Sequence, residues 1–297
     1  MVSLFYESHF LYYLSYKSMN RMNLIGLLLF LSLAMQLISG ILSSYYYSNN
    51  YTLCFNSVVH MLIDISYGYL IRLLHVVGSS CYMFYLIIHY IRGWYRIHSI
   101  NNGYSSNSWI IGVIIMLLSL IIGYIGYTLN WGQMSFWGVT VIVSIIIVLP
   151  LIGYYLATVI LPSFCIGINR LFSFHYLVGF IINYSLLLHI LVLHTFSSSN
   201  TIINSSCTNI IPFIIYSFNK DTMLIVYFFS YFLLFFIMDH DLLINTDNNI
   251  IANPFHTPNN ILPEWYYLLY YCCLRSHSNK NAGVLIVVLL LLLLLLY

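Results

Sequence analysis

The chain has 297 residues, of which 61% are hydrophobic and only 5% charged, and its formal net charge is +2. Soluble domains carry about 25% charged residues, so the composition excludes a soluble protein and predicts an all-α polytopic membrane protein. The small net charge gives no indication of nucleic-acid binding, and we expect none. The six cysteines form no CxxC motif, so the sequence indicates neither a zinc site nor a disulfide framework.

A helix needs about 20 apolar residues to cross a bilayer, and several apolar segments reach or approach this length. The predicted spanning helices cover, in chain order, residues 24–46, 65–92, 109–129, 171–194 and 223–238, and a shorter one runs from 282 to 297. The last has only 16 residues, which is marginal for a span. Polar segments rich in Asn and Ser connect several of these helices.

A further apolar stretch, residues 137–162, allows two interpretations. Its hydropathy suits a spanning helix, but Pro150 lies in its middle and Gly153 follows, which suits two short helices joined by a bend. If the stretch spans, the helices at 65–92 and 171–194 run antiparallel. If it folds back as an interfacial hairpin, they run parallel.

Two histidine pairs have the same spacing on these two helices. His75 and His89 are fourteen residues apart, and so are His175 and His189. Fourteen residues complete almost four helical turns and rise about 21 Å, so the members of a pair share a face near opposite edges of the membrane. If the helices are parallel neighbours, His75 faces His175 and His89 faces His189. Two stacked bis-histidine sites result, and haem is the obvious occupant. A lone membrane histidine could instead be a packing residue.

Glycines on the other two helices repeat the same spacing. Gly26 and Gly40 are fourteen apart, as are Gly112 and Gly126. A porphyrin inside a four-helix bundle needs closely approaching helices, which glycine permits. Small-residue helix packing is the alternative explanation.

Two arginines flank the first histidine pair. Arg72 lies three residues before His75, and Arg92 lies three residues after His89. Haem propionates need cationic partners near the membrane edges, and guanidinium groups suit carboxylates. We therefore predict that Arg72 and Arg92 bind propionates, although Arg92 alone could be a helix-end residue reaching the interface.

Several motifs in this order resemble the cytochrome b family, the di-haem subunits of quinol–cytochrome c reductases (complex III). The family's two haem-ligand helices resemble RLLHVVGSS…HYIRG and RLFSFHYLVGF…HILVLH. Its most recognisable stretch resembles GYTLNWGQMSFWGVTV, and its PEWY segment resembles ILPEWYYLLYYCCLRSHSNKNAGV. The resemblance extends from about residue 24 to residue 290 and implies the hairpin interpretation of 137–162. It implies a di-haem four-helix transmembrane domain at 1–200 and a C-terminal transmembrane domain at 201–297, shorter than the family norm.

The resemblance also implies a reaction and its residues. Ubiquinol is oxidised at one membrane face and quinone is reduced at the other, through a low-potential haem b on His75 and His175 and a high-potential haem b on His89 and His189. This electron transfer contributes to proton translocation. The residues implied near the quinol are Tyr127, Gly138, Glu264 and Tyr271, with Glu264 accepting a proton. Those implied near the quinone are His194, Lys220 and Asp221.

The implied partners are a Rieske iron–sulfur protein, cytochrome c1 and other complex III subunits, in a homodimeric complex in the mitochondrial inner membrane. We expect catalysis only within that complex. Cytochrome b6 resembles the chain too, but its second histidine spacing is one residue longer and its partner subunit carries PDWY. A different di-haem quinol-linked cytochrome would lack WGQMSFWG and PEWY, and a channel or structural membrane protein would bind no haem.

Three positions depart from the family pattern. Asn130 stands where a proline usually precedes WGQM, HVVGSS replaces HANGAS, and LVGF lacks the usual proline after His175. We expect these changes to alter the quinol pocket. The family normally has eight spanning helices, and this sequence ends within the sixth.

Overall fold

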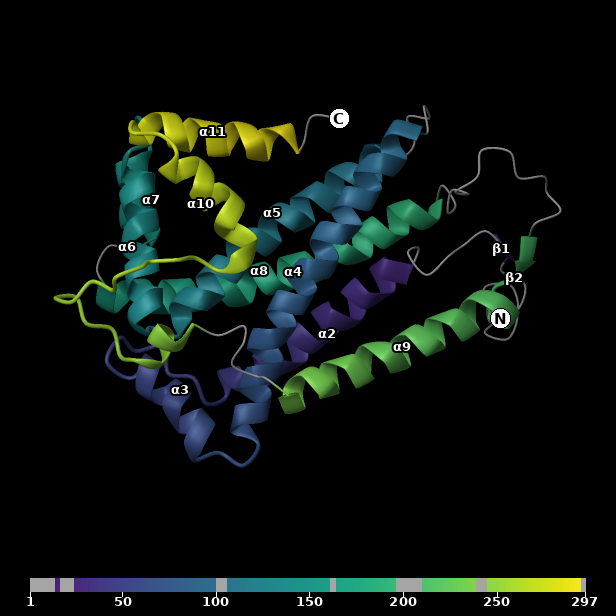
Figure 1. The fold of residues 1–297 in the computed structure, drawn as a ribbon, viewed down its shortest axis with the longest axis horizontal. Coiled ribbons are helices and arrows are strands. Elements are labelled where there is room, and N and C mark those ends of the chain that lie inside the picture. Colours follow the sequence, from purple (N-terminus) through teal and green to yellow (C-terminus); the bar gives the residue numbers. More distant parts are fainter. Residues whose placement is uncertain are drawn as a thin grey trace.

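The computed structural model describes residues 14–16, 24–99, 106–160, 164–195, 210–238 and 245–294, and these are almost entirely helical (Figure 1). Within these described residues, four helices are long and apolar enough to cross a membrane, which confirms the predicted polytopic fold. They are α2 (Ile25–Ser44), α4 (Gly68–Ser99), α5 (Ser106–Leu129) and α8 (Phe164–Thr195). Their ends lie within about two turns of the predicted ones.

The bundle consists of two closely packed helix pairs. The backbone of α2 lies along that of α4, and α5 lies along α8, whereas close backbone approaches between α4 and α8 are few or none among the described residues. Buried side chains of α2, α4 and α5 join the two pairs through a core around Leu29, Met83 and Met116. The backbones of α4 and α8 therefore approach each other less closely than the backbones within either pair.

Polar residues buried inside the spans bond to their own helices. The hydroxyls of Ser32, Ser39, Ser119 and Thr128 each donate to a carbonyl three or four residues earlier, at 2.6–3.0 Å. All four residues are buried. Because no water reaches the bilayer core, a hydroxyl there must find such a partner.

The stretch predicted as either a span or a hairpin forms two short helices, α6 (Gln133–Ile147) and α7 (Gly153–Ile160). Leu151 adopts a left-handed φ of 68° in the break between them. A Cβ on Gly153 would lie 2.2 Å from the Ile146 carbonyl oxygen, so the bend requires glycine there. The hairpin interpretation is therefore confirmed over the described part of the stretch.

Several shorter elements gather at the end of the bundle where α6 and α7 lie (Figure 1). They are α3 (Cys54–Ile63), which the sequence pattern did not reveal, the 3-10 helices η5 (Thr246–Asn249) and η6 (Trp265–Tyr267), and α10 (Leu268–Arg275). The final helix α11 (Lys280–Leu293) packs against α10 and matches the short helix predicted from 282.

The other end of the bundle carries a small addition to the all-helical prediction. β1 (Leu14–Tyr16) pairs antiparallel with β2 (Ile210–Pro212), and α9 (Phe213–Met238) follows directly. This helix begins ten residues before the predicted start at 223, because the polar residues around Asn219 are helical rather than a connection. Phe228 and Phe232 of α9 pack against Leu73 and Val77 of α4.

Candidate functional site

The four predicted histidines meet in two pairs between α4 and α8. The ring centres of His75 and His175 lie 6.1 Å apart, and those of His89 and His189 lie 6.4 Å apart, with 71° between the ring planes in both pairs. Since the earlier histidines pair with each other and the later ones do likewise, α4 and α8 run parallel. The pairing predicted from the fourteen-residue spacing is thus present in the structure.

Hydrogen bonds fix the tautomer of two of these rings. The Ser39 hydroxyl donates to the Met35 carbonyl at 2.6 Å, so its oxygen accepts from Nδ1–H of His75 at 3.0 Å. Nδ1–H of His175 donates to the Ile122 carbonyl at 3.2 Å. With the proton on Nδ1, Nε2 keeps its lone pair for a metal, and the second partner orients the ring. The ring of His189 lies beside the backbone of Ser108.

Each predicted glycine lies against one histidine ring. A Cβ would come 3.8 Å from Cε1 of His89 at Gly26, and 3.0 Å from Cε1 of His75 at Gly40. On the other pair of helices, the Cβ–Cε1 distance would be 3.3 Å from Gly112 to His189 and 2.7 Å from Gly126 to His175. The glycines therefore make room for the imidazoles, and their predicted role in haem binding stays a prediction.

The arrangement fits two axially ligated haems. Two imidazoles that bind one metal from opposite sides, through nitrogens about 2 Å from it, have ring centres about 6 Å apart. Both observed separations match this value. All four histidines are partly buried inside the bundle.

Each arginine lies about one helical turn from a histidine of α4, Arg72 from His75 and Arg92 from His89. Arg72 is half-buried, and its guanidinium donates a 3.2 Å hydrogen bond to the Asn130 side-chain oxygen. Arg92 follows His89 on α4 and is also half-buried. Their predicted role as propionate partners stays a prediction, as does the ligand role of the histidines.

Comparisons with known proteins agree with this geometry. Residues 11–197 match the family described as cytochrome b/b6/petB, and residues 251–297 match cytochrome b (C-terminal)/b6/petD. The chain belongs to the cytochrome b family.

Curated relatives and a solved structure extend the match. The cytochrome b of Paraspadella gotoi is 40% identical over 246 residues, or 81% of this chain and 64% of that protein. That of Marchantia polymorpha is 37% identical over 247 residues, or 81% of this chain and 60% of that protein. The alignments thus span less than two thirds of the length of these two relatives. A chain of a hyperthermophilic respiratory complex III superposes with a TM-score of 0.90 at 26% identity, covering 99% of this chain and 79% of that one.

Membership of the cytochrome b family implies haem b. Of the residues predicted to lie near quinol, Tyr127 and Glu264 lie close together at the His75/His175 end. The 245–256 loop, which precedes the PEWY segment, lies against the start of α6. The backbone N–H of Gln133 donates to the carbonyl oxygen of Ile250 at 2.9 Å. The side-chain oxygen of Gln133 accepts from the backbone N–H of Asn253 at 2.6 Å. The buried Asn248 side-chain oxygen accepts from the backbone N–H of Ser135 at 3.0 Å. These contacts hold the two segments together.

Glu264 lies beside a group of tyrosines at this end. Burial raises the pKa of its carboxyl from 4.5 to about 7. Burial and then the Glu264 charge raise the pKa of Tyr266, which is only 8% exposed. Tyr267 donates its hydroxyl proton to the Leu120 carbonyl. A Cβ on Gly123 would lie 3.1–3.3 Å from both phenol oxygens, so glycine at 123 allows the two rings to pack on α5.

The other predicted quinol-site residues lie on neighbouring elements. Tyr127 is close enough to Glu264 for the two charges to interact, and its carbonyl accepts from the Ser135 hydroxyl at 2.6 Å. Gly138 on α6 has open space on its side-chain side. Tyr271 lies on α10, two turns beyond Glu264, and is half-buried. Sequence reasoning named these residues only through the resemblance, and it missed Ser39, Tyr266, Tyr267 and Asn248.

The predicted quinone-reduction residues are only partly described. The side chain of His194 lies outside the described residues. Lys220 and Asp221 lie on α9 seven or eight residues before Phe228, whose ring centre is 6.1 Å from that of Tyr85. Because α9 runs from the His89/His189 end toward the His75/His175 end, both residues lie at the former end. One carboxyl oxygen of Asp221 is buried without a hydrogen-bond partner.

Proposed function

We propose that the chain is the electron-transfer subunit of a ubiquinol–cytochrome c reductase. It would oxidise ubiquinol at the α6/α7 end of the bundle and reduce quinone at the opposite end. The observation that supports this most directly is the two stacked histidine pairs, with ring centres 6.1 and 6.4 Å apart and a glycine against every ring. Fourteen helical residues separate the two levels by about 21 Å, most of the membrane thickness.

The residues of this chain have separate tasks. Bound on the histidine pairs, haem b accepts and releases one electron at a time. His75 and His175 hold the low-potential group, and His89 and His189 the high-potential one, while Arg72 and Arg92 bind the propionates. At the α6 end, Tyr127, Gly138 and Tyr271 shape the quinol pocket and Glu264 accepts a quinol proton. At the other end His194 and Asp221, with Lys220, deliver protons to quinone.

The assembly and location are part of the same proposal. Electrons leave toward a Rieske iron–sulfur protein and cytochrome c1, which this chain cannot replace because its sequence has no CxxCH haem-attachment motif. We propose that residues 1–200 form the di-haem domain and 201–297 the C-terminal transmembrane domain. A homodimeric complex III in the mitochondrial inner membrane would hold both.

A redox titration of the visible spectrum tests the proposal. The purified membrane complex should contain two b-type haems per chain with separate midpoint potentials. One haem per chain would mean that one histidine pair is not a ligand pair. The absence of a Soret band from the chain would refute the proposal and leave the histidines as packing residues.

Glu264 gives a pH-dependent prediction. A carboxyl with a pKa of about 7 is protonated below that pH and cannot accept a quinol proton. The rate of quinol oxidation should therefore rise with pH up to about 7 and then level off. In Glu264→Gln the rate should fall about 100-fold and this rise should disappear, because an amide does not titrate. Glu264→Asp, which keeps a carboxylate, should retain the rise at a lower rate. A pH profile that is unchanged in the Gln variant would assign the proton to another group.

A further inference from the structure

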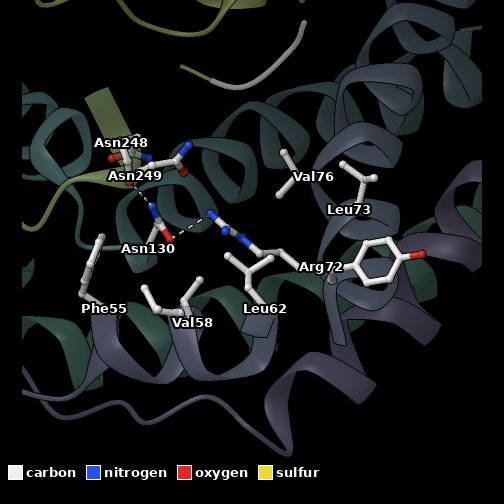
Figure 2. Close-up of a pocket in the computed structure, with 11 residues that line it drawn as sticks. Phe55, Val58, Leu62, Arg72, Leu73, Val76, Asn130, Asn248 and Asn249 are labelled. Atoms are coloured by element: carbon white, nitrogen blue, oxygen red, sulfur yellow. Dashed lines mark hydrogen bonds between the residues drawn. The ribbon is translucent and has the colours of Figure 1, made fainter. Parts of the chain in front are cut away.

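Arg72 reaches into a cavity at the α3 end of α4. The cavity has a volume of about 240 Å³ and lies between α3, the start of α4 and the 245–256 loop (Figure 2). The apolar side chains of Phe55, Val58 and Leu62 line one wall, and Figure 2 shows the guanidinium pointing toward Asn130. A guanidinium has five N–H donors and no acceptor, so in apolar surroundings it needs an oxygen partner to hold one orientation.

Asn130 bonds on both sides of its amide. Its side-chain oxygen accepts from Arg72 at 3.2 Å, and its NH₂ group donates to the Asn248 carbonyl oxygen at 2.8 Å. Arginine can only donate and a carbonyl can only accept, so the amide fits in one orientation alone. Leucine could form neither bond, and aspartate could form only the one to Arg72.

The segment around Asn130 is shaped for this contact. Trp131 has a left-handed φ of 53°, which turns the chain directly after Asn130. A Cβ on Gly132 would lie 2.2 Å from the Asn248 carbonyl oxygen, so the loop approaches too closely for any residue but glycine. The same Asn248 bonds to Ser135 through its side chain. Asn248 is thus hydrogen-bonded to both Asn130 and Ser135, and it is only 6% exposed.

We propose that Asn130 is a positioning residue that couples Arg72 to the 245–256 loop. One end of the link is a cation one turn from His75, and the other end is the loop that leads to Glu264. The link therefore connects the environment of the His75/His175 pair with the segment beside the quinol pocket. The part of this inference that concerns haem rests on the proposed function, whereas the coupling between Arg72 and the loop does not.

Amide hydrogen exchange and redox titration of the membrane complex test the link together. In Asn130→Leu, exchange of the amides at 248–253 should rise about tenfold. The haem on His75 and His175 should become easier to reduce by about threefold, or about 30 mV at 59 mV per tenfold, because the guanidinium charge loses the negative end of the amide dipole. The haem on His89 and His189 should keep its midpoint potential. A general loss of stability would instead affect both haems.

A second variant reverses one of these effects. Asn130→Asp keeps the bond to Arg72, but its carboxylate repels the Asn248 carbonyl oxygen instead of donating a hydrogen bond to it. Hydrogen exchange of the amides at 248–253 should rise as in the Leu variant. The midpoint potential of the haem on His75 and His175 should fall instead of rising. Asn49→Leu is the matched control, since it removes an exposed 2.8 Å bond to Asn169 at the same end of the bundle and should change neither readout.

Two results would overturn the inference. One is loop exchange that stays at the wild-type rate in both Asn130 variants. The other is a pair of haem potentials that shift together or not at all. If the complex holds no haem on His75 and His175, the proposed function fails. A double-mutant cycle of Arg72→Met and Asn130→Leu, measured by loop exchange, then decides the coupling alone: non-additive effects support it and additive effects refute it.

Discussion

Replacing Gly126 with alanine should remove one haem from the protein and leave the other in place. The new Cβ would lie 2.7 Å from Cε1 and 3.3 Å from Nδ1 of His175. The ring cannot turn away freely, because Nδ1 bonds to the Ile122 carbonyl at 3.2 Å. Overpacking of this kind costs about 1–3 kcal/mol, and moving the imidazole breaks the 6.1 Å geometry of its pair. Haem content measured by pyridine haemochrome should fall to about half.

The four glycines form a graded series that makes this prediction sharper. By the Cβ–Cε1 distance, Gly126→Ala should have the largest effect, followed by Gly40→Ala at 3.0 Å and Gly112→Ala at 3.3 Å. Gly26→Ala, at 3.8 Å, should bind both haems. Gly179→Ala on α8 is the control, since its Cβ would meet only the flexible end of Ile122 at 3.4 Å. Equal haem content in the Gly126 and Gly26 variants would show that the glycines do not control ring placement.

Features within one helix could be predicted from the sequence, because helical periodicity relates them directly. The spacing of His75 and His89 placed both on one face of α4. Pro150 and Gly153 were compatible with the two helices that the structure contains, and the family resemblance decided between these and a single span. Even so, the spacing of the glycines did not reveal what they contact. The residues that the glycines contact depend on how α2 packs on α4 and α5 on α8. This packing between helices cannot be read from the sequence of one helix.

Contacts between distant segments could not be predicted from local pattern. Asn130 and Asn248 are 118 residues apart, and the hydroxyl of Tyr267 meets a carbonyl 147 residues earlier. Asn130 gave a signal only as a departure from the family pattern, which predicted a changed pocket but not a bond to Arg72. Helix α3 was missed because its ten residues are too few to span a membrane, although its buried Cys54, Val58 and Met61 do follow a helical period.

Substituting the histidines one at a time should decide which of them share a haem. The structure pairs His75 with His175 and His89 with His189. His75→Leu and His175→Leu should therefore give the same spectrum, each lacking the low-potential haem. His89→Leu and His189→Leu should both lack the high-potential haem. An antiparallel arrangement of α4 and α8 would instead give matching spectra for His75→Leu and His189→Leu.

The double variants complete this test, because two ligands of one metal act as a unit. His75→Leu combined with His175→Leu should lose no more haem than either single variant, whereas His75→Leu combined with His189→Leu should lose both haems. His60→Leu is the control: this exposed histidine on α3 bonds Asp64 at 2.6 Å, far from the bundle interior, and its loss should leave both haems bound. Additive loss within a structural pair would contradict the parallel arrangement, since it would place the two histidines on different groups. If every double variant of the four histidines lost the same amount of haem, the result would contradict two separate haem sites at different depths in the membrane.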